Sequence, residues 1–465
     1  MDIFTSHPSE QGVDPNALHA FLNAIDSDPR IEPHGLIIHR HGHRIAEGYW
    51  APHTAERTRL VYSLSKSFTG TALGLQIGEG RLTLDDLVSD HLPEMFDGAA
   101  DATRRMKIRH IASMATGHDR EMLLEARAAD PGNPVRSFFG IPPDAEPGTL
   151  FAYNQPPVLA LAMILQRLAG ERLVDYLKPR LLEPLGISGF RWAQAQPGVD
   201  MGFSGVYTNL DAVARLGQLY LDDGMWNGQR VLPEGWVADA SRVHIENPQR
   251  IEPDWRQGYG FQLWMSQHGY RGDGAYGQYM VVLPAYDAMI AMFSCIEQMQ
   301  VVLDLMWEHL LPGMGANRSA TTEDAALADR LTGLALPTAI QHRGGEPAQP
   351  ANQSFQPAQH NPLSQRSITS VEIADNTMVV HEGDAAIHVP LNNEWTINSD
   401  GAVAASSTAL LDGTIAVSLL FLDTPHRLEV ELKASESTFS SKWGHMPLFG
   451  AGLAPKLQSL RAPST

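Results

Sequence analysis

The stretch RLVYSLSKSFTGTALG, from Arg59 to Gly74, decides how this sequence is interpreted. It places Ser63 three residues before Lys66, and no other serine and lysine share S-x-x-K spacing in a chain with six lysines. Apolar residues recur at helical spacing after this pair until glycines end the run. We therefore predict a helix that follows the strand-like RLVY and carries the pair on one face.

Such a pair has either a catalytic or an ordinary structural meaning. A serine hydroxyl is a poor nucleophile until a base takes its proton, and a lysine helps only if burial or other cations lower its pKa. Free N–H groups at the helix start, including that of Ser63, can stabilise an oxyanion. The alternative is a solvated serine and lysine on an exposed face. The segment around Lys66 is apolar, so we expect a buried lysine.

Composition narrows the class of protein. The 465 residues are 43% hydrophobic, enough for a globular protein of two or three domains. A net charge of −19 and a pI near 5.4 oppose binding to nucleic acid or to an anionic membrane, so we expect a small-molecule or peptide substrate. No signal peptide or long apolar run is found, and one cysteine, Cys295, excludes an internal disulfide. We expect a cytoplasmic protein whose oligomeric state stays open.

Hydrophobic patterns predict an α+β domain over residues 1–315. HGLIIHRHGHRIAEGYW alternates around a His-Gly pair and predicts two antiparallel strands. Later, GYGFQLWM is strand-like, and QYMVVLP and DAMIAMFSCIE predict a hairpin beside the first two strands. Residues 82–189 between them are mostly helical. We therefore expect an antiparallel sheet built from both ends of the domain, flanked by helices, with a helical subdomain in the middle.

The remainder of the chain differs in composition and in hydrophobic pattern. Residues 316–367 begin with a helix and continue into a stretch rich in Pro, Gln and Asn, which predicts a linker. Residues 368–465 contain short alternating runs separated by turn residues, which predict a small all-β domain. We expect the first domain to fold without this second one.

Two further fragments are candidates for the same site as Ser63. PGTLFAYNQ places Tyr153 just before a helix, where its phenol can act as a general base or proton shuttle, although packing is the more ordinary role of such a tyrosine. GYRGDGAYGQYMVVLP places glycines along a strand edge, where a substrate can lie against backbone donors. A flexible turn is the alternative for that cluster.

Together these fragments resemble the serine β-lactamase and penicillin-binding-protein superfamily, specifically the serine hydrolases and esterases related to class C β-lactamases. The likeness runs over about Gln11 to Pro312 and includes YSLSKSFTGTALGLQIGEGRLTLDD, EPLGI and LGQLYLDDGMWNGQRVLPEGWV. It implies a β-lactamase-like fold. It also implies Ser63 as the acylated nucleophile, Lys66 as its activating partner, Tyr153 as general base and the amides of Ser63 and Ala275 as oxyanion hole. Further residues implied to face the substrate are Gln155, Gly272, Asp273, Gly274 and Tyr276.

Two positions depart from the family's pattern. Gln155 stands where the second motif usually ends in asparagine. Gly272, Asp273 and Gly274 stand where the third motif has Lys-Thr-Gly or His-x-Gly, so the cation is missing. Arg271 is adjacent, but it should point to the opposite strand face from residue 272. In β-lactamases and carboxypeptidases that lysine helps to hold a substrate carboxylate, so its absence argues against both activities.

We therefore predict a serine hydrolase that cleaves a small ester, amide or peptide through an acyl-Ser63 intermediate. An acyl transferase or peptide cyclase of the same fold is one alternative, and a ligand-binding protein without turnover is another. No G-x-S-x-G or H-E-x-x-H motif occurs, and we expect neither a metal nor a cofactor.

Overall fold

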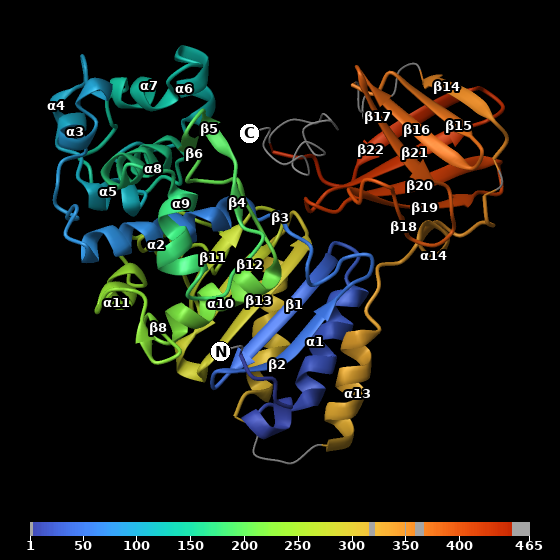
Figure 1. Cartoon of the computed structure of the whole chain (residues 1–465), viewed down its shortest axis with the longest axis horizontal. Coiled ribbons are helices and arrows are strands. Elements are labelled where there is room, and N and C mark those ends of the chain that lie inside the picture. Colours follow the sequence, from blue (N-terminus) through green and yellow to red (C-terminus); the bar gives the residue numbers. More distant parts are fainter. Residues whose placement is uncertain (1–2, 316–320, 349, 359–366, 449–465) are drawn as a thin grey trace.

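A six-stranded antiparallel sheet forms the centre of the molecule in the computed structural model, which describes residues 3–315, 321–348, 350–358 and 367–448 (Figure 1). The strand order is β10-β11-β12-β13-β1-β2, so strands from both ends of the domain lie side by side, as the sequence predicts. Their bounds are β1 Glu32–Arg40, β2 His43–Tyr49, β10 Trp264–Ser266, β11 Gly269–Gly274, β12 Gln278–Leu283 and β13 Ala288–Cys295.

The predicted strand pairs are confirmed, with one difference in length. β1 pairs with β2, and β12 pairs with β13 through the turn Pro284–Tyr286. GYGFQLWM was predicted as a strand, but only its last two residues belong to β10. Gln262, within that segment, adopts a positive φ of 60°, which interrupts an extended strand.

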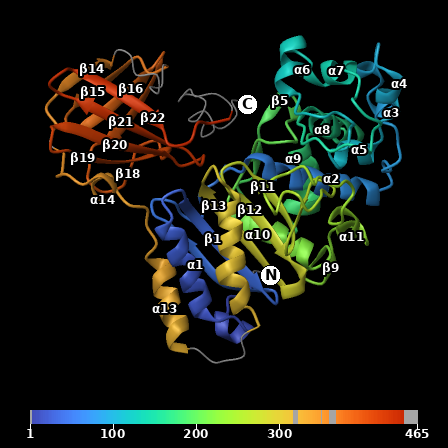
Figure 2. The ribbon, with the colours of Figure 1, turned by 180° about the vertical axis from the view of Figure 1, so that it is seen from behind.

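Helices cover both faces of the sheet. One face carries α1 (Pro15–Ser27), α12 (Gln300–Leu305) and α13 (Thr321–Thr332), as Figure 2 shows from behind. The other carries α10 (Leu210–Leu221) and α2 (Ser65–Gly78). α1 begins sharply because Asp14 accepts a hydrogen bond from the Asn16 amide and Pro15 occupies the first helical position.

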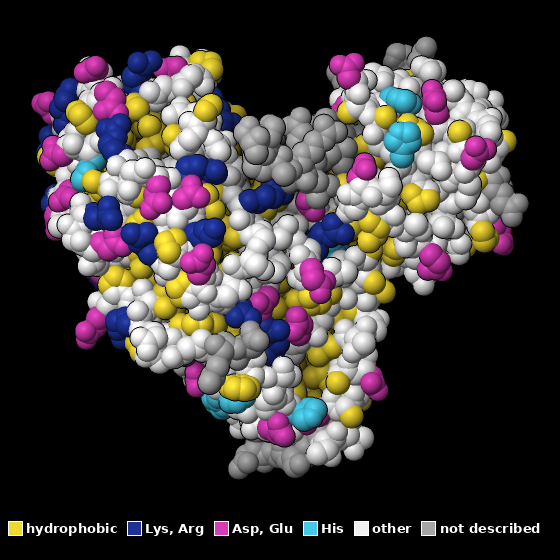
Figure 3. Space-filling model, in the orientation of Figure 1, with side chains coloured by type: hydrophobic (Ala, Val, Ile, Leu, Met, Phe, Trp, Pro, Cys, Tyr) yellow, Lys and Arg dark blue, Asp and Glu magenta, His cyan; other side chains and the backbone are white. Residues whose placement is uncertain are grey.

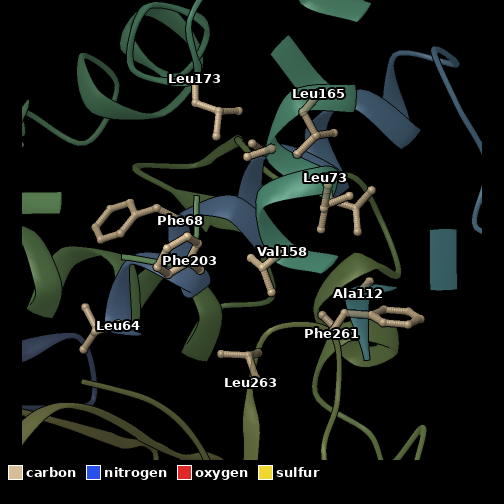
Figure 4. Packing of buried hydrophobic residues seen from close by; sticks show 14 of the residues in the cluster. Leu64, Phe68, Leu73, Ala112, Val158, Leu165, Leu173, Phe203, Phe261 and Leu263 are labelled. Atoms are coloured by element: carbon tan, nitrogen blue, oxygen red, sulfur yellow. The ribbon is translucent and has the colours of Figure 1, made fainter. Parts of the chain in front are cut away.

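The helical subdomain predicted for residues 82–189 packs against α2. Figure 4 shows Phe68 and Leu73 of α2 among Val158 and Leu165 of α8, all of them buried. This packing fixes α2 between the sheet and the subdomain, which positions the start of α2 for the site described below. The helices are α3 Val88–His91, α4 Asp101–Arg104, α5 Ile108–Ala112, α6 Leu123–Ala129, α7 Pro134–Gly140, α8 Pro156–Ala169, α9 Leu173–Leu177 and η4 Lys178–Leu182, with α11 Trp236–Ala240 following α10.

A nine-stranded sheet forms the C-terminal region, hereafter the β module. All its pairs are antiparallel except β14 with β22, and its core includes Phe355, Val417 and Trp443. The module begins earlier than predicted, because β14 lies inside the expected linker and pairs with β15 and β22. Its strands are β14 Gln353–Pro357, β15 Ser370–Ala374, β16 Thr377–Glu382, β17 Ala385–Pro390, β18 Thr396–Ile397, β19 Val403–Ala409, β20 Thr414–Phe421, β21 Arg427–Lys433 and β22 Thr438–Trp443.

The two predicted units share a hydrophobic cluster, which differs from the expected independence of the first domain. Leu420 and Leu422 of the β module are buried together with Trp50 and Leu336 of the first part of the chain. α13, predicted to begin the linker region, packs on α1 and β2 instead. The residues 359–366 and 449–465, predicted as parts of the linker and the all-β domain, lie outside the described residues.

Charged side chains are spread over the visible surface of the molecule. On the face in Figure 3, acidic and basic side chains of the described residues are interspersed rather than gathered in one patch. Within those residues, no helix combines the length and the apolar character that a bilayer crossing requires.

Candidate active site

Ser63 lies in a tight turn, η2 (Tyr62–Leu64), between the short strand β3 (Arg59–Leu60) and α2. The sequence predicts this serine at the start of the helix. In the structure it lies in a 3₁₀ turn that directly precedes α2. Every residue from Arg59 to Gln76 is buried except Ser63, which is partly exposed. The fold therefore presents one hydroxyl of this segment to solvent.

Lys66 is 1% exposed, as the apolar segment predicts. Its Nζ lies 3.1 Å from Ser63 Oγ and donates further hydrogen bonds of 2.8 Å to Gln155 Oε1 and to the Phe203 carbonyl. Burial lowers the pKa of Lys66 to about 7, against a smaller opposing effect of the Asp273 and Glu121 charges. A neutral amine is therefore accessible at neutral pH, in contact with the serine.

Tyr153 reaches the same point from the loop before α8. Burial raises the pKa of its phenol, and the Ser63 side chain is near enough to exert a smaller opposing effect on that pKa. Its ring stacks on Trp264 with 5.1 Å between centroids, and Lys66 Nζ lies 4.8 Å from the Tyr153 ring centroid. The structure thus brings the serine, the lysine and the tyrosine together.

Gln155 contacts Lys66 rather than standing apart from it. The extra methylene relative to asparagine does not prevent its Oε1 from accepting from the ammonium. The Phe203 carbonyl is a second acceptor that sequence reasoning missed. A backbone carbonyl 137 residues away carries no side-chain signal, so only the fold could identify it.

The glycines of β11 lie against the nucleophile turn. A Cβ added at Gly274 would meet the Val61 carbonyl oxygen at 2.0 Å and the Leu64 nitrogen at 3.2 Å. A Cβ at Gly272 would meet Ser67 Oγ at 2.2 Å. Only glycine allows the strand to approach α2 this closely. Such an approach brings the end of β11, which Ala275 follows, against the turn η2 that contains Ser63.

Asp273 points to the other face of β11 from Gly272, and so does Arg271. Arg271 is fully buried, donates from Nε to Asp273 Oδ2 at 3.0 Å and lies 4.2 Å from the Trp255 ring centroid. This arrangement agrees with the predicted direction of Arg271. It also pairs the Asp273 carboxylate with Arg271, while the Asp273 charge still acts on the pKa of Lys66.

Tyr276 follows Ala275 in a left-handed conformation with φ 67°. Its hydroxyl donates to the Met446 carbonyl of the β module, and its ring lies 5.4 Å from that of Tyr62. The side chain is therefore held by neighbouring protein groups.

Comparisons with known proteins place this geometry in a family. Residues 30–311 match the family model described as Beta-lactamase. A 6-aminohexanoate-dimer hydrolase of Paenarthrobacter ureafaciens is 26% identical over 272 residues, which cover 54% of this chain and 69% of that protein.

Two solved structures share the fold. One is EstCE1, described as a hydrolase with promiscuous acyltransferase activity, with a TM-score of 0.51 and 19% identity over 64% of this chain and 99% of that chain. The other is the octameric penicillin-binding protein homologue from Pyrococcus abyssi, with a TM-score of 0.50 and 15% identity over 90% of this chain and 98% of that chain.

Proposed function

This chain belongs to the beta-lactamase family and has a hydrolase fold, and from that premise we propose that it is a serine hydrolase acting through an acyl intermediate on Ser63. We propose a small ester or amide, peptides included, as substrate. The observation that carries the proposal is the contact of 3.1 Å between Ser63 Oγ and Lys66 Nζ, in a setting that lowers the Lys66 pKa to about 7.

The first step transfers the serine proton. Neutral Lys66 accepts the Ser63 hydroxyl proton while Oγ attacks the substrate carbonyl carbon. The resemblance to the family implies Tyr153 as general base. Its raised pKa, however, keeps the phenol protonated at neutral pH, so it is a weaker candidate than Lys66 for accepting the serine proton. We therefore assign the base to Lys66 and a proton relay to Tyr153, whose phenol lies near the Ser63 side chain.

The following steps release both products. The amides of Ser63 and Ala275 donate to the oxyanion of the tetrahedral intermediate. As that intermediate collapses, the bond to the leaving alcohol or amine breaks and the leaving group takes a proton through Tyr153. Water then attacks the acyl-Ser63 carbonyl and gives a proton to the same relay. The second tetrahedral intermediate collapses as the bond between the acyl carbon and Ser63 Oγ breaks, Oγ takes that proton back, and the acid leaves with the free serine restored.

The third motif favours a substrate that needs no carboxylate anchor. Residue 272 has no side chain, Ser67 Oγ occupies the space beside it, and Arg271 is paired on the opposite strand face. The related 6-aminohexanoate-dimer hydrolase is named for a substrate other than a β-lactam. Both observations support a linear ester or amide over a β-lactam.

Acyl transfer is a second candidate, because the structurally similar EstCE1 is described with that activity as well. The acyl intermediate is the same in both reactions, and only the acceptor differs. Product analysis of p-nitrophenyl butyrate turnover with and without an added amine distinguishes them: butyrate alone indicates hydrolysis, and a butyramide indicates transfer.

Covalent labelling tests the assignment of the nucleophile. We expect a fluorophosphonate to label the wild type once per chain and p-nitrophenyl butyrate to be turned over. Ser63→Ala should abolish both, since it removes the attacking oxygen and opens no sizeable cavity. The matched control is Ser67→Ala, because Ser67 is a buried serine whose hydroxyl lacks a hydrogen-bond partner within the described structure. Labelling that survives in Ser63→Ala would refute the proposal.

A further inference from the structure

The turn between β20 and β21 of the β module, residues 422–426, docks on the strand that leads into the nucleophile. The Leu60 amide donates to the Asp423 carbonyl at 2.8 Å, and Arg57 and Arg191 each lie 3.7 Å from the Asp423 carboxylate. Asp423 and His426 are 3% and 1% exposed. Figure 1 shows the module reaching toward β3. The turn is therefore part of a buried interface beside Ser63.

His426 contacts the residue that directly precedes the nucleophile. Its Nε2 shares a hydrogen bond with the Tyr62 hydroxyl, and the two rings meet edge to face with 5.9 Å between centroids. Tyr62 has a φ of 49°, a backbone conformation that residues other than glycine rarely adopt. Because such backbone persists only where surrounding contacts determine it, the His426 contact helps to hold the Ser63 amide in its direction.

His426 also contacts the residue that directly follows the second proposed oxyanion donor. Its ring lies 4.8 Å from that of Tyr276, again edge to face, and Tyr276 has a φ of 67°. Tyr62 and Tyr276 touch each other as well, at 5.4 Å. One histidine of the β module thus packs against both left-handed residues that flank the Ser63 and Ala275 amides.

The turn that carries His426 is itself well determined. The His426 amide donates to Thr424 Oγ1, and that hydroxyl donates to the Phe421 carbonyl. Trp443 of β22 lies 6.0 Å from the His426 ring on the module side. These contacts connect the histidine rigidly to the β sheet.

The geometry points to His426 as a positioning residue for the oxyanion hole, which makes the β module part of the catalytic apparatus. This inference rests on the proposed acyl-Ser63 mechanism. His426 touches neither the serine nor a substrate, and it acts through Tyr62 and Tyr276. An oxyanion hole stabilises the transition state through amides aimed at the developing charge, so a small misdirection lowers kcat and leaves ground-state binding unchanged.

Three variants of His426 separate positioning from packing. His426→Phe keeps a ring for the edge contacts and loses the hydrogen bond, and His426→Ala loses both. His426→Gln places an amide nitrogen near the position of Nε2 and should restore much of the lost rate. His388→Phe is the matched control, because that histidine lies exposed on β17 of the same module.

The readouts are kcat and KM for p-nitrophenyl butyrate, the inhibition constant of a phenylboronic acid and the melting temperature. We expect kcat to fall about 10- to 100-fold in His426→Ala, less in His426→Phe and least in His426→Gln, with KM within about twofold. The boronate, which forms a tetrahedral adduct on serine, should lose affinity in parallel with kcat.

Other results would overturn the inference. A raised KM with unchanged kcat would make the module a substrate-binding element, and a lowered melting temperature with unchanged kinetics would make His426 purely structural. Failure of the proposed mechanism has a separate signature, because wild type would then show no Ser63 labelling by a fluorophosphonate. Labelling that is retained but slower in His426→Ala supports both.

Discussion

The two walls of the active site differ in how far they follow the family's pattern. On the α2 side, Ser63, Lys66 and Tyr153 lie together, as the resemblance implies. Lys66 is buried and hydrogen-bonded to Ser63 and Gln155. On the β11 side, glycine replaces the cation at residue 272, and Asp273 is paired with Arg271. The difference separates two tasks: the groups proposed to attack a carbonyl lie together, and residue 272 has no side chain that could anchor a carboxylate.

The largest effect should follow from removing the Lys66 amine on the α2 side of the site. Lys66→Met removes the amine at nearly constant volume and should lower kcat by about 10²- to 10⁴-fold, the range for losing a general base. Lys107→Met, in the helical subdomain, is the matched control and should leave kcat unchanged. Wild-type activity in Lys66→Met would show that another group accepts the serine proton.

The pH dependence of activity tests the role of Lys66 without a mutation. Lys66 must be neutral to accept a proton, and its neutral fraction rises as the pH rises through its pKa of about 7. We therefore expect kcat/KM for p-nitrophenyl butyrate to increase with pH and level off above about 8, with an apparent pKa near 7. A profile flat between pH 5 and pH 9 would contradict a lysine base.

A somewhat smaller effect should follow from Tyr153→Phe. The phenol lies near the Ser63 side chain, so its loss should cost about 10²-fold in kcat if it relays the proton to the leaving group. A leaving group that needs no proton bypasses this step, so the loss should be greater for an amide than for a p-nitrophenyl ester. Tyr286→Phe, in the turn between β12 and β13, is the control, and an equal loss for both substrates would count against the relay.

The β11 wall is tested by substrate choice. A missing charge-assisted hydrogen bond to the substrate carboxylate is worth about 1.5–3 kcal/mol, so nitrocefin should be hydrolysed about 10- to 100-fold less efficiently than if the cation were present. Gly272→Lys alone would place its Cβ against Ser67 Oγ, but in a Ser67→Ala background the nearest Ser67 atom is Cβ at 3.3 Å. We expect the double variant to gain nitrocefin activity and keep esterase activity, with Ser67→Ala as control. Efficient nitrocefin hydrolysis by the wild type would refute the interpretation of this wall.

A clear effect on stability should come from the apolar cluster that the β module shares with the sheet domain. Leu422 is fully buried in the cluster that both parts share, and Leu422→Ala should lower the free energy of unfolding by about 2–5 kcal/mol. Leu411→Ala, at a fully exposed position of the same module, should change it by less than about 0.5 kcal/mol. Equal melting temperatures for the two variants would show that the parts are energetically independent.

The sequence was sufficient for features that depend on local pattern. The S-x-x-K spacing predicted the contact between Ser63 and Lys66, and strand periodicity predicted the hairpin of β12 and β13. It was not sufficient to predict contacts between residues that are far apart in the sequence. The Phe203 carbonyl on Lys66, the fit of Ser67 beside Gly272 and the contact of His426 with Tyr62 each join segments that no local pattern relates. The start of the β module was also missed, because β14 is a short strand that pairs only through the tertiary fold.

The most direct test of the central claim is to trap the acyl intermediate and locate it. Rapid mixing of the enzyme with excess p-nitrophenyl butyrate, followed by acid quenching and peptide mass analysis, asks which residue carries the butyryl group. We predict a burst of p-nitrophenol and one butyryl group on the peptide that contains Ser63, and neither in Ser63→Ala. A butyryl group on another residue, or turnover without any covalent adduct under conditions where a burst is seen, would contradict it.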